Sequence, residues 1–264
     1  MSMIGLGTIL SVALLAGCEK KNEEAPAAPA APPAAAPAAP AAPAAPAPTA
    51  STDKGTVTGE VVITGKVPEM PELKRSTDPF CGKTKMKDEQ VVAKAGKLAN
   101  VLIHIDGIAP TATPPTAKAQ IEQLNCMYRP RVQGIVAGQT LIIKNGDPVL
   151  HNVHTYKGTS TMFNQAQVPH TPDIEKKFTN EGAMLKFKCD VHQWMTGYVW
   201  VQNNPFFAVT DDTGKFEIKD VPVGKYTIEA WQERFGTKKG EITVSKDKPA
   251  EIKFEYTGTE TAEK

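Results

Sequence analysis

The chain lacks a strong charge of either sign and is poor in aromatic residues. Its 30 Lys and Arg face 29 Asp and Glu among 264 residues, which gives a formal net charge of +1. Because no basic stripe or patch stands out, we expect no nucleic-acid partner. Segments with a helical period of apolar residues are also scarce, so the sequence gives little support for an α-helical fold.

The sequence instead contains many short runs of β-branched residues. Gly, Pro, Asp and Asn separate them, a pattern typical of β-sandwiches. We therefore predict an all-β fold of two sandwiches, the second smaller than the first. The residues 116–124 are left open, because their composition also suits a helical turn. The predicted strands cover residues 57–63, 101–105, 140–143, 198–201, 215–218, 226–231, 241–244 and 251–256.

The apolar run at the N-terminus is too short to cross a bilayer. It ends in Leu15-Ala-Gly-Cys18 and resembles a bacterial lipoprotein signal peptide over residues 1–18. The resemblance implies that Cys18 becomes a lipidated first residue, and Glu19 after it implies an outer-membrane anchor facing the periplasm. Residues 1–10 depart from such peptides because they contain no Lys or Arg. The alternative is a buried N-terminal helix.

The segment after Cys18 is rich in alanine and proline. Proline recurs at nearly every third position between residues 25 and 50, which blocks helix and strand and favours an extended polyproline II conformation. We interpret residues 19–54 as a semi-rigid linker between the anchor and the folded part.

A cluster of soft metal ligands lies near residue 190. Cys189, His192 and Met195 follow the spacing C-x-x-H-x-x-M, and a thiolate, an imidazole and a thioether suit copper better than magnesium or calcium. β-rich runs flank them, so the ligands would share one loop between strands. The alternative is a buried free cysteine beside a core histidine.

The residues 137–154 complete a recognisable pattern. The apolar run at 140–143 leads to His151-Asn-Val-His154, and this order before Cys189 resembles the cupredoxins, with their type 1 (blue) copper. The short ligand loop is most similar to that of the amicyanins, whereas plastocyanins have a longer gap. The resemblance covers about residues 120–202 and implies a Greek-key β-sandwich that binds one copper. Its ligands would be His151, Cys189 and His192, with Met195 as a weak axial ligand.

The other histidines rank lower as ligands. His154 lies three residues after His151, and residues three apart on a strand point to opposite faces. The two imidazoles are therefore not expected to face one metal. The Asn-Val after His151 also matches the resemblance, so His154 is the second choice. His104 alternates with apolar residues and is expected in a strand, while His170 lies between prolines and is expected at the surface.

The resemblance also implies roles around the copper. Asn152 would tie its loop to the cysteine loop, although Asp190 replaces the usual Thr or Ser and leaves the partner of Asn152 open. The edge of His192 would be the solvent-facing route for electrons. The expected docking patch around it consists of Pro148, Val149, Gln193 and Trp194.

The four cysteines have separate expected roles. If Cys18 is lipidated and Cys189 binds copper, Cys81 and Cys126 remain as a pair outside the cytoplasm. We predict a disulfide between them, with two free thiols as the alternative.

The C-terminal part resembles a carboxypeptidase regulatory-like, or prealbumin-like, β-sandwich. Residues 210–218 read T-D-x-x-G-x-F-x-I, and residues 222–228 read P-x-G-x-Y-x-I. Asp-Thr-Gly predicts a hairpin turn and Pro-Val-Gly another. This module, residues 204–258 before a tail at 259–264, is short for a sandwich. Either strands from residues 55–106 complete it, or it simply follows a cupredoxin domain with an N-terminal extension at 55–203.

These observations predict a periplasm-facing copper protein that carries single electrons between partners such as a cytochrome or an oxidoreductase. The alternative is a copper storage, delivery or sensing lipoprotein, although exposed Met-rich or Cys-pair motifs are lacking. A copper enzyme would need more histidines than the five present, so we do not expect an enzyme.

Overall fold

The computed structural model describes residues 53–179 and 181–262. Cys18, the predicted signal peptide and nearly all of the predicted linker lie outside these residues. Within them the secondary structure is β-strand apart from one 3₁₀ turn, η1 (Cys81–Lys83). No helix among these residues has the length and hydropathy of a membrane span. The predicted all-β class is confirmed.

Eighteen strands are described, and they include every strand that the sequence predicted. Residues 119–124, which composition left between helix and strand, form a strand. The strands are β1 (Lys54–Ile63), β2 (Ala93–Lys94), β3 (Lys97–Leu98), β4 (Leu102–Asp106), β5 (Ala119–Leu124), β6 (Met127–Arg129), β7 (Val132–Val136), β8 (Thr140–Asn145), β9 (His151–Lys157), β10 (Ser160–Gln167), β11 (Ile174–Lys177), β12 (Ala183–Lys188), β13 (Thr196–Gln202), β14 (Phe207–Val209), β15 (Lys215–Pro222), β16 (Gly224–Gln232), β17 (Gly236–Val244) and β18 (Ala250–Tyr256).

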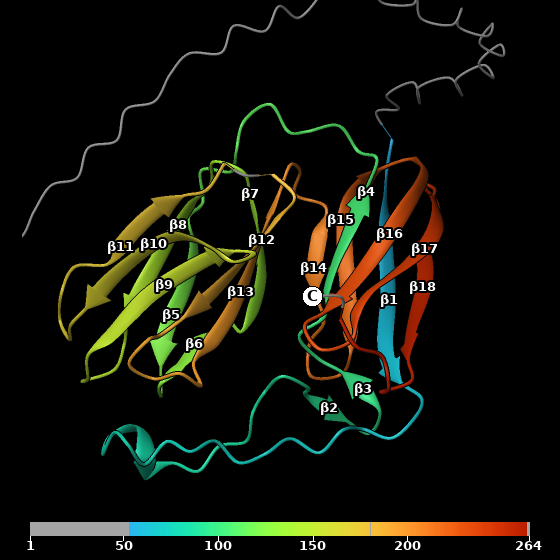
Figure 1. Ribbon diagram of the computed structural model, residues 1–264. Helices are drawn as coiled ribbons and strands as arrows, with labels where there is room; N and C mark the ends of the chain where they lie inside the picture. The colour runs from blue at the N-terminus through green and yellow to red at the C-terminus, as the bar shows by residue number, and fades with distance from the viewer. Residues whose placement is uncertain (1–52, 180, 263–264) are drawn as a thin grey trace, which may run out of the picture. The chain divides into compact units, whose positions relative to one another are not determined.

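One sandwich combines strands from the two ends of the described chain, and we call it the split sandwich. Its first sheet has the order β15-β1-β3-β2, with β18 paired to β1, and its second has the order β14-β4-β16-β17. The β1 strand runs parallel to β18 and antiparallel to β15 (Figure 1). Residues 54–106 thus share both sheets with residues 207–256.

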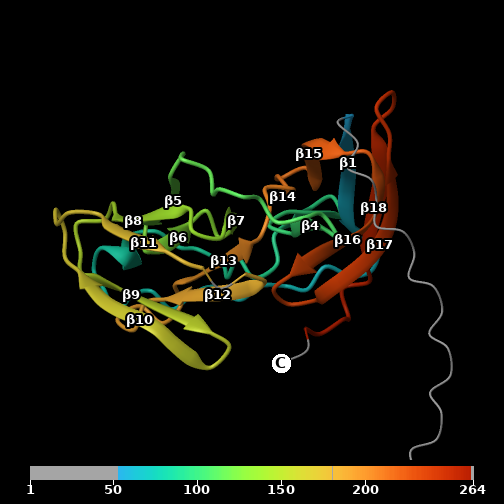
Figure 2. The same ribbon diagram turned by 90° about the horizontal axis from the view of Figure 1, so that it is seen from above.

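The strands between these two parts form the inserted sandwich. One sheet has the order β10-β9-β12-β13-β7 and the other β11-β8-β5-β6. Figure 2 shows the two layers, with β9 and β10 in one and β5 and β8 in the other. Burial alternates along β12 and β13, because every second side chain points into the core between the two sheets.

Each sandwich has its own hydrophobic core. The inserted core contains Tyr128 and Phe187, whose rings meet edge to face, and it extends to Cys189 and Met195. In the split core, the Phe216 ring covers Gly59 on the neighbouring strand, where an added Cβ would lie 2.6 Å from the ring. The ligand-bearing loops therefore emerge from a packed, rigid scaffold.

The two turns predicted near the C-terminus join different sheets. At Asp-Thr-Gly, Gly214 adopts a φ of +72° and its amide donates to the Asp211 carbonyl oxygen at 2.9 Å. The strands on either side are β14, which pairs with β4, and β15, which pairs with β1. The predicted hairpin is therefore wrong. The turn before Gly224 likewise passes from β15 to β16 in the other sheet.

Residues 64–92 form a segment with little regular structure between β1 and β2, and we call it the strap. The predicted disulfide is present and joins Cys81 of the strap to Cys126 in the β5–β6 turn, with a Cα–Cα distance of 5.7 Å. The buried Arg75 guanidinium donates to the carbonyl oxygens of Thr84 and Asn125. The strap is thereby fixed to the inserted sandwich.

Candidate metal centre

Three predicted ligands meet at one end of the inserted sandwich. His151 begins β9, Cys189 follows directly after β12, and His192 lies in the short loop from β12 to β13. Because β9 and β12 are paired neighbours in the same sheet, the start of one strand and the end of the other bring His151 beside Cys189. A residue spacing of three then returns His192 to the same point.

The donor atoms of these residues face one another in the core. The Nδ1 atoms of His151 and His192 are 2.9 Å apart, and the Cys189 Sγ lies 3.9 Å and 3.7 Å from them. All three residues are buried, with exposed fractions of 0% to 2%. Two imidazole nitrogens and one sulfur thus surround a single enclosed point.

A carboxylate lies at the other ring nitrogen of each histidine. The His151 Nε2 is 2.9 Å from Asp147 Oδ2, and the His192 Nε2 is 3.4 Å from Asp78 Oδ2. If each Nε2–H donates to its carboxylate, both Nδ1 lone pairs point at the enclosed site, together with the sulfur. A soft cation satisfies three such lone pairs, and the donor set therefore fits copper.

Hydrogen bonds favour the thiolate form of Cys189. Burial opposes its ionisation, but the contacts with His151 and with the backbone amides of Asn152 and His192 outweigh burial and lower the pKa of the thiol. The Asn152 amide donates to the sulfur at 3.5 Å. Since the thiolate is the form that binds metals, this environment prepares Cys189 as a ligand.

The environment of His151 differs from that of His192. Burial lowers the pKa of His151, but Asp147 and Cys189 outweigh it and the pKa is raised. For His192, burial and the neighbouring His151 prevail over Asp78 and lower the pKa. His192 is thus the more readily neutral imidazole of the two.

Met195 lies in the same buried cluster as Cys189 and has no exposed surface. Its amide donates to the His192 carbonyl oxygen at 2.9 Å, which closes a turn in the ligand loop. The structure thus gathers His151, Cys189 and His192 and places Met195 in the core beside them.

Asn152 and Asp190 join the two ligand loops. The Asn152 side-chain amide donates to Asp190 Oδ2 at 2.8 Å, while the Asp190 backbone amide donates to Asn152 Oδ1. Asp190 is therefore the partner that the sequence left open. His154 Nδ1 also lies 3.0 Å from the Asp190 carboxylate, and its Nε2 is 2.9 Å from the Thr161 hydroxyl. The hydrogen-bonding partners of His154 thus belong to this exposed network.

The expected exposure of the His192 edge to solvent is wrong. Only 2% of His192 is exposed, and Asp78 of the strap lies at the ring atom that would have faced water. Of the expected docking residues, Pro148 and Gln193 are exposed. Trp194 packs at the edge of the core, and its indole N–H donates to the Cys126 carbonyl oxygen at 3.0 Å.

Asp147 and Asp78 are the site residues that sequence reasoning missed. Asp147 is 4% exposed and also accepts hydrogen bonds from the backbone amides of Asn125 and Cys126, both at 2.7 Å. Asp147 lies four residues before His151. This short separation could have indicated that its carboxylate contacts the histidine. Asp78 lies 114 residues before His192, and only the predicted disulfide three residues later pointed to this neighbourhood.

Other candidate sites lie in the split sandwich. His104, predicted as a strand residue, is buried in β4 with its Nε2 3.1 Å from Asp106 and 3.8 Å from Glu229. Lys239 pairs with Glu229 at 2.5 Å, so the Glu229 carboxylate already has a cationic partner. His170 is exposed, as predicted.

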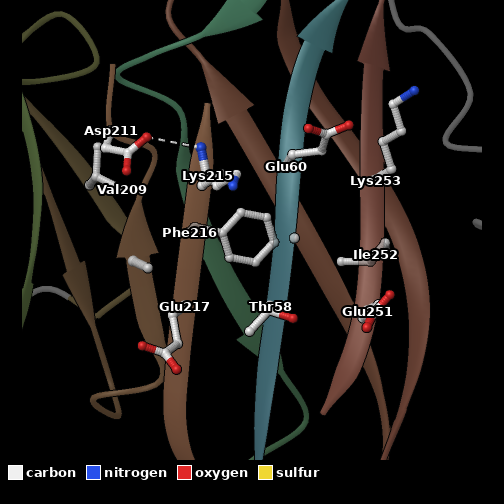
Figure 3. Close-up of a pocket in the computed structure, with 12 residues that line it drawn as sticks. Thr58, Glu60, Val209, Asp211, Lys215, Phe216, Glu217, Glu251, Ile252 and Lys253 are labelled. Carbon is white, nitrogen blue, oxygen red and sulfur yellow. Dashed lines mark hydrogen bonds between the residues drawn. The ribbon is translucent and has the colours of Figure 1, made fainter. Parts of the chain in front are cut away.

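A surface hollow of about 960 Å³ lies over β1, β15 and β18 (Figure 3). Charged side chains such as Glu60, Glu217 and Lys253 surround the Phe216 ring there. The hollow contains none of the predicted metal ligands. The hollow and the predicted metal ligands are therefore in different sandwiches.

Comparisons with known proteins give partial likenesses. Residues 183–252 match the family model for polysaccharide lyase family 4, domain II, and this match includes strands of both sandwiches. No curated protein matches the chain.

Several solved copper-protein structures resemble part of the chain. A purple cupredoxin from Nitrosopumilus maritimus is 27% identical and covers 32% of this chain and 100% of its own, with a TM-score of 0.29. Amicyanin from Paracoccus versutus is 23% identical and covers 38% and 97%, with a TM-score of 0.29. A copper-containing nitrite reductase from Thermus scotoductus SA-01 is 19% identical over 38% of this chain and 26% of its own, with a TM-score of 0.30. Since these scores are low, we base the site on its own geometry.

Proposed function

We propose that the chain binds one type 1 copper and carries single electrons between protein partners of the cell envelope. The observation that carries this proposal is the convergence of His151 Nδ1, Cys189 Sγ and His192 Nδ1 in a buried site. Met195 would provide the weak axial ligand. Bound copper would supply the Cu(II)/Cu(I) couple.

The protein would contribute rigidity and electrostatics to electron transfer. The buried core fixes Cys189, and Asp147 holds the His151 ring by its Nε2. Asn152 and Asp190 hold the two ligand loops together. With the donors preorganised in this way, little has to move when the charge of the site changes.

Copper loading tests the metal assignment. We expect one copper per chain and an intense blue, purple or green colour from the thiolate of Cys189. The Cys189→Ser variant should remain folded and colourless, because a serine oxygen does not provide the same charge-transfer absorption. A colourless Cu(II) form of the unaltered protein, or a site that retains only zinc, would contradict the proposal.

One observation favours the alternative of copper storage, delivery or sensing. The strap covers the His192 edge, and an enclosed site suits retention of the metal. Voltammetry and stopped-flow mixing with a cytochrome c separate the two functions. A carrier gives a reversible one-electron wave and fast exchange with the copper retained, whereas a storage protein exchanges slowly or releases copper on reduction.

The cellular location is part of the proposal. The predicted anchor, Cys18, lies outside the described residues, and a lipid there would hold the protein at the periplasmic face of the envelope, most simply the outer membrane. Cys18→Ala should move the protein from the detergent phase to the aqueous phase in a partitioning assay. Unchanged partitioning would count against the anchor.

A further inference from the structure

The strap places the Asp78 carboxylate beside His192, a candidate copper ligand that lies 114 residues later in the sequence. Asp78 Oδ2 lies 3.4 Å from His192 Nε2, and the side chain of His192 is 2% exposed. Asp78 itself is 23% exposed, so it lies at the boundary between the site and water. It occupies the place where a solvent molecule would otherwise contact the ring.

The Asp78 carboxylate is held in a defined orientation. Its Oδ1 accepts hydrogen bonds from the backbone amides of Phe80 at 2.8 Å and Cys81 at 3.0 Å. These bonds leave Oδ2 directed at His192. Both carboxylate oxygens thus have hydrogen-bonding partners, two amides at Oδ1 and the imidazole at Oδ2.

The strap around Asp78 is fixed on both sides. Cys81, three residues later, is bonded to Cys126. Arg75, three residues earlier, is buried and donates to the Asn125 carbonyl oxygen. Both anchors end at the same Asn125–Cys126 turn, whose amides also donate to Asp147. One turn thus supports the carboxylates of both histidines.

We propose that Asp78 is a positioning residue that holds His192 by its Nε2–H and, with the strap, closes the copper site on that side. This inference rests on the proposed copper site and names a residue that lies outside the inserted sandwich. A carboxylate on the second nitrogen fixes the tautomer and orientation of a metal-binding histidine. Its negative charge also stabilises Cu(II) more than Cu(I).

The first experiment measures Cu(II) affinity by chelator competition at constant pH. We expect Asp78→Asn to lose about 10- to 100-fold in affinity, because its amide N–H faces the ring nitrogen and favours the tautomer with a protonated Nδ1. The reduction potential should rise at the same time. Asp78→Glu should restore most of the affinity, since it keeps a carboxylate.

A matched control removes a charge elsewhere on the strap. Glu72→Gln affects an exposed residue that pairs with Lys85 at 3.8 Å, and we expect no change in affinity or potential. Equal behaviour of Asp78→Asn and Glu72→Gln would overturn the proposal. Equal losses in Asp78→Asn and Asp78→Glu would also overturn it, because they would show that packing of the strap matters and the carboxylate does not.

The second experiment does not depend on copper chemistry. In the zinc(II)-loaded protein, NMR should detect a His192 Nε2–H that exchanges with water at least ten times more slowly than the ring N–H of the exposed His170. Asp78→Asn should remove this protection. Rapid exchange in the unaltered protein would refute the role of Asp78 and leave the proposed function standing. A colourless copper form would refute the proposed function, and the zinc measurement would then still decide the role of Asp78.

Discussion

Arg131 and Glu233 form a buried ion pair that connects the two sandwiches. Arg131 precedes β7 of the inserted sandwich, and Glu233 follows β16 of the split sandwich. The Arg131 Nε lies 2.5 Å from Glu233 Oε1 and its Nη2 lies 3.0 Å from Oε2, with both side chains at most 5% exposed. Such a bidentate pair fixes orientation as well as distance.

Removal of one partner should therefore be costly. We expect Glu233→Gln to lower the free energy of unfolding by about 3 kcal/mol, the lower end of the range for breaking a buried pair. The buried Arg131 charge would then keep only the more distant Asp88 carboxylate, 3.8 Å from its Nη2, as a counter-ion. Urea unfolding followed by tryptophan fluorescence measures this. The control is Glu175→Gln, which breaks the exposed pair with Lys118 and should cost about 0–1 kcal/mol. Similar losses in both variants would show that the buried pair has no special role.

The disulfide should stabilise the strap and the protein. Replacing both Cys81 and Cys126 by serine should lower the free energy of unfolding by about 2–4 kcal/mol, since the unfolded chain regains the freedom of a loop closed across 45 positions. In metal-free protein that lacks Cys18, thiol titration under denaturing conditions without reductant should find Cys189 alone. Detection of three thiols would contradict the disulfide.

The pair of Asn152 and Asp190 should matter for metal binding. Asn152→Ala removes the reciprocal hydrogen bonds between the two ligand loops, so we expect Cu(II) affinity to fall by about 10-fold. Chelator competition provides the measurement. Asn164→Ala is the comparison, because it removes one hydrogen bond to Asp190 and one from Asn152 but leaves the reciprocal bonds between Asn152 and Asp190 in place. A larger effect at Asn164 would contradict this role of Asn152.

His104 should make stability depend on pH near neutrality. Burial lowers its pKa below the ordinary 6.5, and the opposing effects of Asp106 and Glu229 do not restore it. Its ring also packs against Trp200, with centroids 4.7 Å apart. As the pH falls below about 6.5, the unfolded chain binds a proton more readily than the folded one, so stability is lost.

The His104→Phe variant isolates this effect because it keeps a ring against Trp200 and cannot titrate. Urea unfolding of both metal-free proteins at pH 7.5 and pH 5.5 gives two differences in the free energy of unfolding. We expect the smaller difference for His104→Phe, and equal differences would refute the assignment. The other histidines are present in both proteins, so their contributions cancel.

The sequence predicted the parts of the site that depend on local spacing. Cys189, His192 and Met195 lie in one short loop. Strand alternation indicated that only one of His151 and His154 faces the metal, and the resemblance to the cupredoxins selected His151. The contact between Asp78 and His192 could not be predicted in this way, because it depends on the path of the strap across the fold. The expected exposure of His192 failed for the same reason: the strap covers an edge that the local sequence leaves open.

The strands followed a similar rule. Alternating or β-branched runs gave β1, β8 and β13 within a few residues, since burial of one face depends on neighbouring positions in the chain. The predicted hairpin at Asp-Thr-Gly failed because a turn motif specifies a change of direction and does not specify which strand becomes the partner. That choice is made by packing between the sheets.

The parallel pairing of β1 with β18 also constrains the order of events during synthesis. The first strand leaves the ribosome roughly 190 residues before its partner, since Val57 pairs with Ala250 and Ile63 with Tyr256. All strands of the inserted sandwich lie between them and can pair while β18 is still being made. Until then, β1 has an open edge that is able to pair with other chains. Premature termination between Gln202 and Ala250 would thus yield a chain with a complete inserted sandwich and an aggregation-prone first strand.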